Sequence, residues 1–141
     1  MEDVYGEPRW RPLRRTLGLL LLFGSAVLTG CLVQAPYQPD SQRVAALGVS
    51  QAQQQLEGVL LRSINPPITA VEVTGDFVRV DVGTTTYQVR VFFQDVQKAD
   101  VYTNHLVILR GADDRLLFRP IFANAQDATT FADLMLAMRT R

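Results

Sequence analysis

The chain contains few side chains that could act as nucleophiles, bases or metal ligands. It has one cysteine, Cys31, and one histidine, His105. A single cysteine cannot form an internal disulfide, so its thiol is free, paired with another molecule or modified. His105 follows Asn104 in an expected turn, and no second histidine is present to help complete the three or four ligands of a zinc site. We therefore expect a structural or surface histidine, no metal, and Cys31 as the first candidate for chemistry.

Adjacent carboxylates at Asp113 and Asp114 follow Gly111. Calcium needs six to eight oxygen ligands from spaced acidic residues, so this pair is better explained as a hairpin turn. The chain also lacks a Gly-x-Ser-x-Gly motif, a phosphate-binding loop and a dinucleotide fingerprint. We expect a non-catalytic protein without a cofactor. An enzyme would instead require His105 close to a second polar group in a pocket.

Three arginines, Arg110, Arg115 and Arg119, surround the expected hairpin. They could form a small basic patch, and we take them as a possible interaction surface. Asp113 and Asp114 lie in the same stretch and should largely compensate this charge. Once residues 1–30 are set aside, 10 basic and 11 acidic residues remain. Because no basic field is left, we expect no nucleic-acid partner.

The segment before Cys31 has the organisation of a secretory signal. A basic region precedes an apolar run over residues 17–33, and small residues stand at its end. The basic residues are Arg9, Arg11, Arg14 and Arg15. An uncleaved membrane helix is the alternative, but the run is at the lower limit for spanning ~30 Å of hydrocarbon and contains three glycines. We therefore expect residues 1–30 to be a signal peptide.

The four residues Leu28-Thr29-Gly30-Cys31 resemble the lipobox of bacterial lipoproteins. The resemblance implies diacylglycerol on the Cys31 sulfur, cleavage before Cys31 and acylation of the new amino group. Two or three chains would anchor the protein firmly to a membrane, whereas one binds only marginally. Leu32, rather than aspartate, follows the cysteine, which by the same resemblance favours the periplasmic leaflet of the outer membrane if the source is Gram-negative.

Residues 31–48 are predicted to be the lipidated cysteine followed by an extended tether. After Cys31 this stretch contains two prolines and three glutamines, and it shows no steady hydrophobic period. A small globular domain is expected over residues 49–141. Its first element should be a helix with Ser50 as the N-cap and Gln53 completing a capping box. The run Asn65-Pro66-Pro67 should end that helix.

The rest of the domain changes to a period of two residues. Short alternating strands joined by turns predict an antiparallel meander with one buried face. The expected strands are 68–73, 77–82, 87–93, 96–102, 106–110 and 115–122. A final helix should start after Asn124 and bury Phe131, Leu134, Met135 and Met138.

The fold class predicted from these elements is α+β. The strands and the C-terminal helix resemble a small, partly open pleckstrin-homology-like barrel, in which a helix closes one end. A sandwich with both helices on one face of the sheet fits the same pattern.

For function, the anchor and the missing catalytic set favour a lipid-anchored, non-catalytic interaction module of the cell envelope. It would bind an envelope partner through a sheet edge or barrel mouth. The alternative is a carrier of a small apolar ligand or lipid, although densely packed interiors make a closed core the default. The cavity would then be lined by Val89, Val91, Phe93, Leu106, Ile108, Leu117 and Ile121.

Overall fold

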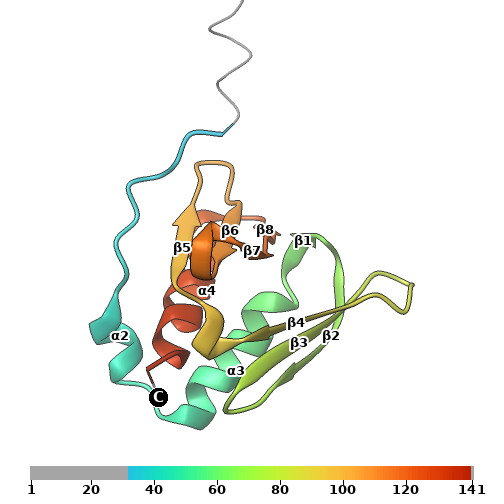
Figure 1. The fold of residues 1–141 in the computed structure, drawn as a ribbon, viewed down its shortest axis with the longest axis horizontal. Coiled ribbons are helices and arrows are strands. Elements are labelled where there is room, and N and C mark those ends of the chain that lie inside the picture. The colour runs from blue at the N-terminus through green and yellow to red at the C-terminus, as the bar shows by residue number, and fades with distance from the viewer. Residues whose placement is uncertain (1–31, 141) are drawn as a thin grey trace, which may run out of the picture. The chain divides into compact units, whose positions relative to one another are not determined.

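A computed structural model of the chain describes residues 32–140. The predicted signal peptide, the lipobox and Cys31 lie outside the described residues. Val33–Arg141 forms one compact unit. It consists of small antiparallel sheets and three helices within the described residues, so the α+β class and the C-terminal helix are confirmed (Figure 1).

Three small sheets make up the β structure of residues 32–140. The first contains β2 (Ile68–Val73), β3 (Phe77–Val82) and β4 (Gln88–Phe92) in sequential order. The second contains β5 (Lys98–Val101), β6 (Val107–Arg110) and β7 (Leu116–Phe118), and the third pairs β1 (Ser63–Asn65) with β8 (Ile121–Phe122). Two 3₁₀ turns, η1 (Phe93–Asp95) and η2 (Ala112–Asp114), connect strands.

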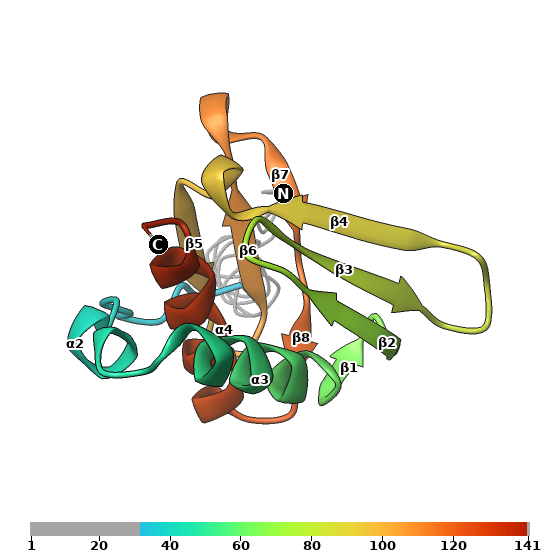
Figure 2. The ribbon, with the colours of Figure 1, turned by 90° about the horizontal axis from the view of Figure 1, so that it is seen from below.

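The helices are α2 (Ser41–Ala45), α3 (Val49–Leu60) and α4 (Ala125–Met138). The helix α3 packs against β2, α4 packs against β5, and the two helices contact each other (Figures 1 and 2). Phe131 of α4 is at the centre of the core, with its ring 6.3 Å from that of Phe118 and 5.3 Å from that of Phe122. The predicted stripe of α4 is buried throughout, and Asn124 caps the helix by accepting the Asp127 N–H at 2.8 Å.

The expected barrel does not close in the part of the chain that the structure describes. The predicted strand 115–122 is two strands, because Pro120 interrupts it. Proline has no N–H to donate, and after it Ile121 and Phe122 pair with β1 while still lying beside Leu106 and His105, just before β6. The two three-stranded sheets are separate, with β4 and β7 at their edges.

The first predicted helix begins and ends earlier than expected. Gly48 is the N-cap of α3, and Gln51 accepts the Gly48 N–H through its side chain. The assignment of Ser50 as N-cap is therefore wrong, because the helix already includes Val49. Residues 63–65 form β1 rather than a last helical turn, since they find backbone partners in β8.

The predicted tether is attached to the domain. Ala35 N donates to Val101 O at 2.8 Å, and Thr103 N donates to Val33 O at 2.9 Å. The segment 33–35 therefore adds to the outer edge of β5. Residues 41–45 then form α2, which buries Val44. These contacts correct the prediction of a free spacer over 32–48, because backbone groups can pair with a sheet edge without any hydrophobic pattern.

A carboxylate in α4 secures this docked segment. The Tyr37 hydroxyl donates to Asp133 Oδ1 at 2.6 Å, and the Asp40 N–H donates to the same oxygen at 3.0 Å. Burial raises the pKa of Tyr37 well above its ordinary value, and the Asp133 carboxylate raises it further. The phenol therefore stays protonated as a donor. Asp133 sits on a mostly apolar helix, and its spacing gave no sign of this role.

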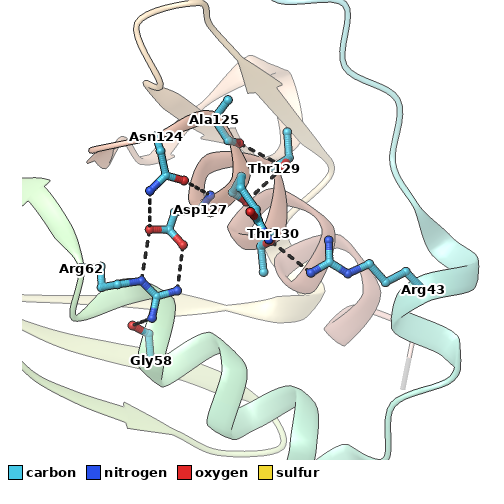
Figure 3. A network of polar contacts seen from close by, with 9 residues as sticks. Arg43, Gly58, Arg62, Asn124, Ala125, Asp127, Thr129 and Thr130 are labelled. Carbon is cyan, nitrogen blue, oxygen red and sulfur yellow. Dashed lines mark hydrogen bonds and ion pairs between the residues drawn. The ribbon is translucent and has the colours of Figure 1, made fainter.

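A second carboxylate joins the two long helices. Arg62, just after α3, donates to both oxygens of Asp127 at 2.7 and 3.1 Å, and Asn124 donates to Asp127 Oδ2 at 3.1 Å (Figure 3). Asp127 is buried. The side-chain hydrogen bond from Arg62 lowers the pKa of Asp127. A charged carboxylate is thus held between the end of α3 and the start of α4.

Candidate binding cleft

An apolar cleft of about 650 Å³ lies where the two three-stranded sheets fail to meet. Its walls come from the start of β4, from β7 and from the segments beside β1 and β8. The lining residues are Asn65, Pro66, Tyr87, Val89, Leu106, Leu116, Leu117, Phe118, Arg119 and Ile121. The hairpin that joins β3 and β4 projects away from the other sheet (Figures 1 and 2), which separates the two walls at this end.

Four of the seven residues predicted to surround a cavity line this cleft: Val89, Leu106, Leu117 and Ile121. Val91 and Phe93 instead belong to the closed core, where they are 3% and 2% exposed. Position along the chain explains the difference, because Val89 lies near the start of β4, whereas Val91 lies further along and Phe93 follows in η1, which contacts α4. Six of the seven predicted residues therefore belong to the cleft or the core, and Ile108 is half-buried outside both.

Large apolar side chains remain exposed at the rim. Tyr87 is 63% exposed and Leu116 is 50% exposed. Scattered apolar residues are common on protein surfaces, but a group around one cleft indicates a contact surface. Covering these two side chains would be favourable by the hydrophobic effect.

The backbone of β4 is unpaired on the side away from β3. Val82 N donates to Tyr87 O, and Phe93 N donates to Asp76 O. Both bonds fit the single register in which Val80 faces Val89 and Val78 faces Val91. Because antiparallel pairs alternate, Gln88, Arg90 and Phe92 direct their N–H and C=O groups outward. No described strand pairs with that edge.

The two three-stranded sheets differ in whether another segment pairs with their outer edges. The docked segment 33–35 pairs with the end of β5, at Val101 and the two residues after it. The outer edge of β4 is five residues long, and although β7 lies near part of it, no segment within residues 32–140 pairs with its backbone. Unprotected edge strands readily accept another strand. The open edge beside an apolar cleft is therefore the strongest candidate site.

Charged residues flank the open edge on the outer face of the sheet. Glu72, Arg79 and Arg90 stand side by side on β2, β3 and β4. Arg79 pairs with Glu72 at 2.9 Å, whereas Arg90 lies 4.8 Å above the centre of the Phe77 ring. The described residues that line the cleft include one cation, Arg119, and no acid. The site is thus positive on the side where a new strand would add.

The three arginines of the predicted interaction surface have different surroundings in the structure. Arg110 donates to the buried Asp100 at 3.3 Å and also lies 3.6 Å from Asp114. Arg115 is exposed after η2, and Arg119 is exposed at the cleft. Asp100 also accepts from Lys98 and Gln34, so Arg110 belongs to a group that holds the docked segment. Of the three arginines, Arg119 is the one that lines the cleft.

The other residues considered as candidates in the sequence do not form a binding or catalytic site. His105 is half-buried in a turn with a φ of 64°, and it lines a separate shallow cleft of about 530 Å³ with Tyr37 and Asp133. Asp113 and Asp114 are turn residues with φ values of 54° and 60°, as expected for a tight hairpin. Among residues 32–140, no group of three or more His, Cys, Asp or Glu side chains could hold a metal ion.

A further cleft of about 690 Å³ separates α2 from α3 and α4. It is slightly larger than the cleft beside β4, but its walls are mainly helices and turns. Helical backbone groups are already bonded within the helix, so they offer no template for a partner strand. The cleft beside β4 combines an apolar floor with free backbone groups, and we prefer it for that reason.

Comparison with known proteins does not assign the chain to a family. No protein-family model matches the chain, and no similar curated protein or solved structure was found. In the described part of the chain, no helix is both long and apolar enough to cross a membrane. Function must therefore be inferred from the cleft, the open edge and the N-terminal sequence.

Proposed function

We propose that this protein is a lipid-anchored, non-catalytic component of the bacterial cell envelope that binds another protein. The sequence Leu28-Thr29-Gly30-Cys31 supports the anchor. Lipids on Cys31 would hold the chain to a membrane, with the outer membrane favoured in a Gram-negative source because Leu32 follows the cysteine. The compact unit would then act at the membrane surface.

The anchor is tested by the mass of the N-terminal peptide from membrane-extracted protein. We expect a peptide that starts at Cys31 and carries diacylglycerol and a further acyl group. Cys31→Ser should abolish the lipid mass, because the sulfur that accepts the diacylglycerol is gone. Thr29→Ser, which keeps a small hydroxylated residue, should remain lipidated. An intact leader or a bare thiol in the native protein would refute the anchor.

The observation that carries the binding proposal is the free edge of β4 beside an apolar cleft. A partner segment in extended conformation would pair with the outward groups of Gln88, Arg90 and Phe92. Its inward side chains would enter the cleft next to Tyr87 and Val89. Backbone bonds would supply affinity and the cleft would supply selectivity.

Proline at position 90 tests this mode of binding. The Arg90 N–H points away from β3, so Arg90→Pro should leave the sheet intact and remove only an outward donor. Arg90→Ala is the matched control, since both changes remove the arginine above Phe77. With the full chain in detergent, we expect Arg90→Pro to capture at least tenfold less partner from solubilised envelopes than Arg90→Ala. Equal capture by both variants, with equal thermal midpoints, would contradict strand addition.

A small apolar ligand is the second candidate occupant. A volume of about 650 Å³ falls within the range of small-molecule sites, and the lining is mostly apolar. Native mass spectrometry of the intact protein separates the two possibilities. A co-purified amphiphile that persists in Arg90→Pro would favour a carrier, because such a ligand does not need the strand edge.

A further inference from the structure

Side chains on the outer face of the β2-β3-β4 sheet form a charged row that stops at its open edge. Arg79 lies directly opposite Glu72 on one side and Arg90 on the other. Glu72 neutralises Arg79. No ion pair within residues 32–140 neutralises Arg90, which is exposed and rests on the Phe77 ring. A strand that pairs with β4 would place one of its own side chains at the next position in this row.

The register of β4 defines which guest residue takes that position. Because Arg90 directs its backbone groups outward, the residue opposite it in an antiparallel guest strand forms a hydrogen-bonded pair, with Cα atoms about 5.5 Å apart. Its side chain points to the outer face, as Arg90 does. Opposite charges at such paired positions are favourable, and like charges are unfavourable.

Given the proposed strand addition, we propose that the partner segment carries an acidic residue opposite Arg90, flanked on both sides by apolar residues. The acid would extend the row from Glu72 through Arg79 and Arg90. The flanking residue beside Val89 would enter the apolar cleft, and the one beside Val91 would meet the apolar edge of the closed core. The recognised pattern is therefore apolar, acidic, apolar in an extended peptide.

Two further observations support an acidic partner. Arg119 adds a second exposed cation at the cleft wall. Asp81 is the acid on the outer face of β3, one strand further from the guest than Arg90, and no ion pair joins it to Arg90. Both arginines are thus open to a carboxylate from outside the domain.

The same row argues against pairing of β4 with β4 of a second copy. In the symmetric arrangement centred on Arg90, this residue would face its own counterpart. Like charges directly opposite each other destabilise an antiparallel pair. A second copy is therefore a poorer occupant than a segment that supplies a carboxylate.

The test compares two labelled peptides, Thr-Val-Glu-Val-Thr and Thr-Val-Lys-Val-Thr, that have acetylated and amidated ends. Their binding to the full chain in detergent is measured by fluorescence polarisation. We expect the glutamate peptide to bind about three- to tenfold more tightly. Salt at 0.5 M should reduce this ratio, because exposed charges are screened.

Charge reversal assigns the preference to a residue. Arg90→Glu should invert the order, so that the lysine peptide binds more tightly. A merely destabilised protein would weaken both peptides alike. Arg139→Glu makes the same change in net charge at the exposed end of α4, and it should leave the order unchanged.

The outcomes separate this inference from the binding proposal on which it rests. Equal binding of both peptides would overturn the acidic requirement and leave strand addition standing. A preference that survives Arg90→Glu would overturn the role of Arg90. If neither peptide binds at millimolar concentration, strand addition fails and the acidic requirement fails with it.

Discussion

Replacing Phe131 by alanine is expected to lower the free energy of unfolding by about 3–5 kcal/mol. Its side chain is fully buried, and its ring contacts those of Phe118 and Phe122. The change removes apolar contacts and leaves a cavity between α4 and the strands β7 and β8. Urea unfolding of a fragment 32–141, which contains the compact unit, measures the loss.

Leu61→Ala is the control for this change. Leu61 is 46% exposed at the end of α3, so truncation should cost well under 1 kcal/mol. Similar losses for the two variants would contradict the position of Phe131 at the centre of the core.

Asp127→Asn is expected to lower the free energy of unfolding by about 2 kcal/mol at neutral pH. The change removes a buried charge that accepts two hydrogen bonds from Arg62 and one from Asn124. Glu72→Gln is the matched control, because it breaks an arginine–carboxylate pair that is exposed to solvent. Such surface pairs contribute about 0–1 kcal/mol.

The effect of Asp127 should depend on pH in a defined direction. The folded state lowers the pKa of this carboxyl. Its contribution is therefore complete above the pKa of the unfolded chain, at about 4, and is lost as the pH falls through the lower folded value. The stability difference between wild type and Asp127→Asn should be constant from pH 5 to 7 and shrink below about pH 4. A difference that grows on acidification would contradict the ion pair with Arg62.

Local periodicity was sufficient to predict most of the strands and the last helix. Val78 and Val80 alternate with charged residues, and Phe131, Leu134 and Met135 follow helical spacing. Each of these apolar side chains is buried. Such patterns depend on neighbouring residues alone, so they survive without knowledge of the tertiary structure.

The docking of residues 33–48 could not be predicted in this way. Its bonds join backbone groups of Val33 and Ala35 to the end of β5, and the side chains of Gln34 and Tyr37 to Asp100 and Asp133. Both partners lie far away in the sequence. Glutamines and prolines in a segment without hydrophobic period are typical of a linker, and no local signal distinguishes a docked segment from a free one.

The candidate site was predicted in part. The alternation of β4 placed Val89 on an inner face, and Arg119 was recognised as a possible contact. The open edge itself was not predictable, because whether a strand is paired depends on where other strands end. The significance of Arg90 follows only from the register that sets it beside Arg79, and from its lack of an ion pair with any described carboxylate.

The backbone bond from Thr103 to Val33 has a consequence for the lipidated form that we propose. One residue, Leu32, separates Cys31 from Val33, and two such steps along the chain span at most about 8 Å. In that form, an anchor this short would give the compact unit little reach away from the membrane surface. The protein would meet its partners by diffusion in the plane of the membrane. Those partners would lie in the same leaflet or would extend a strand to the lipid headgroups.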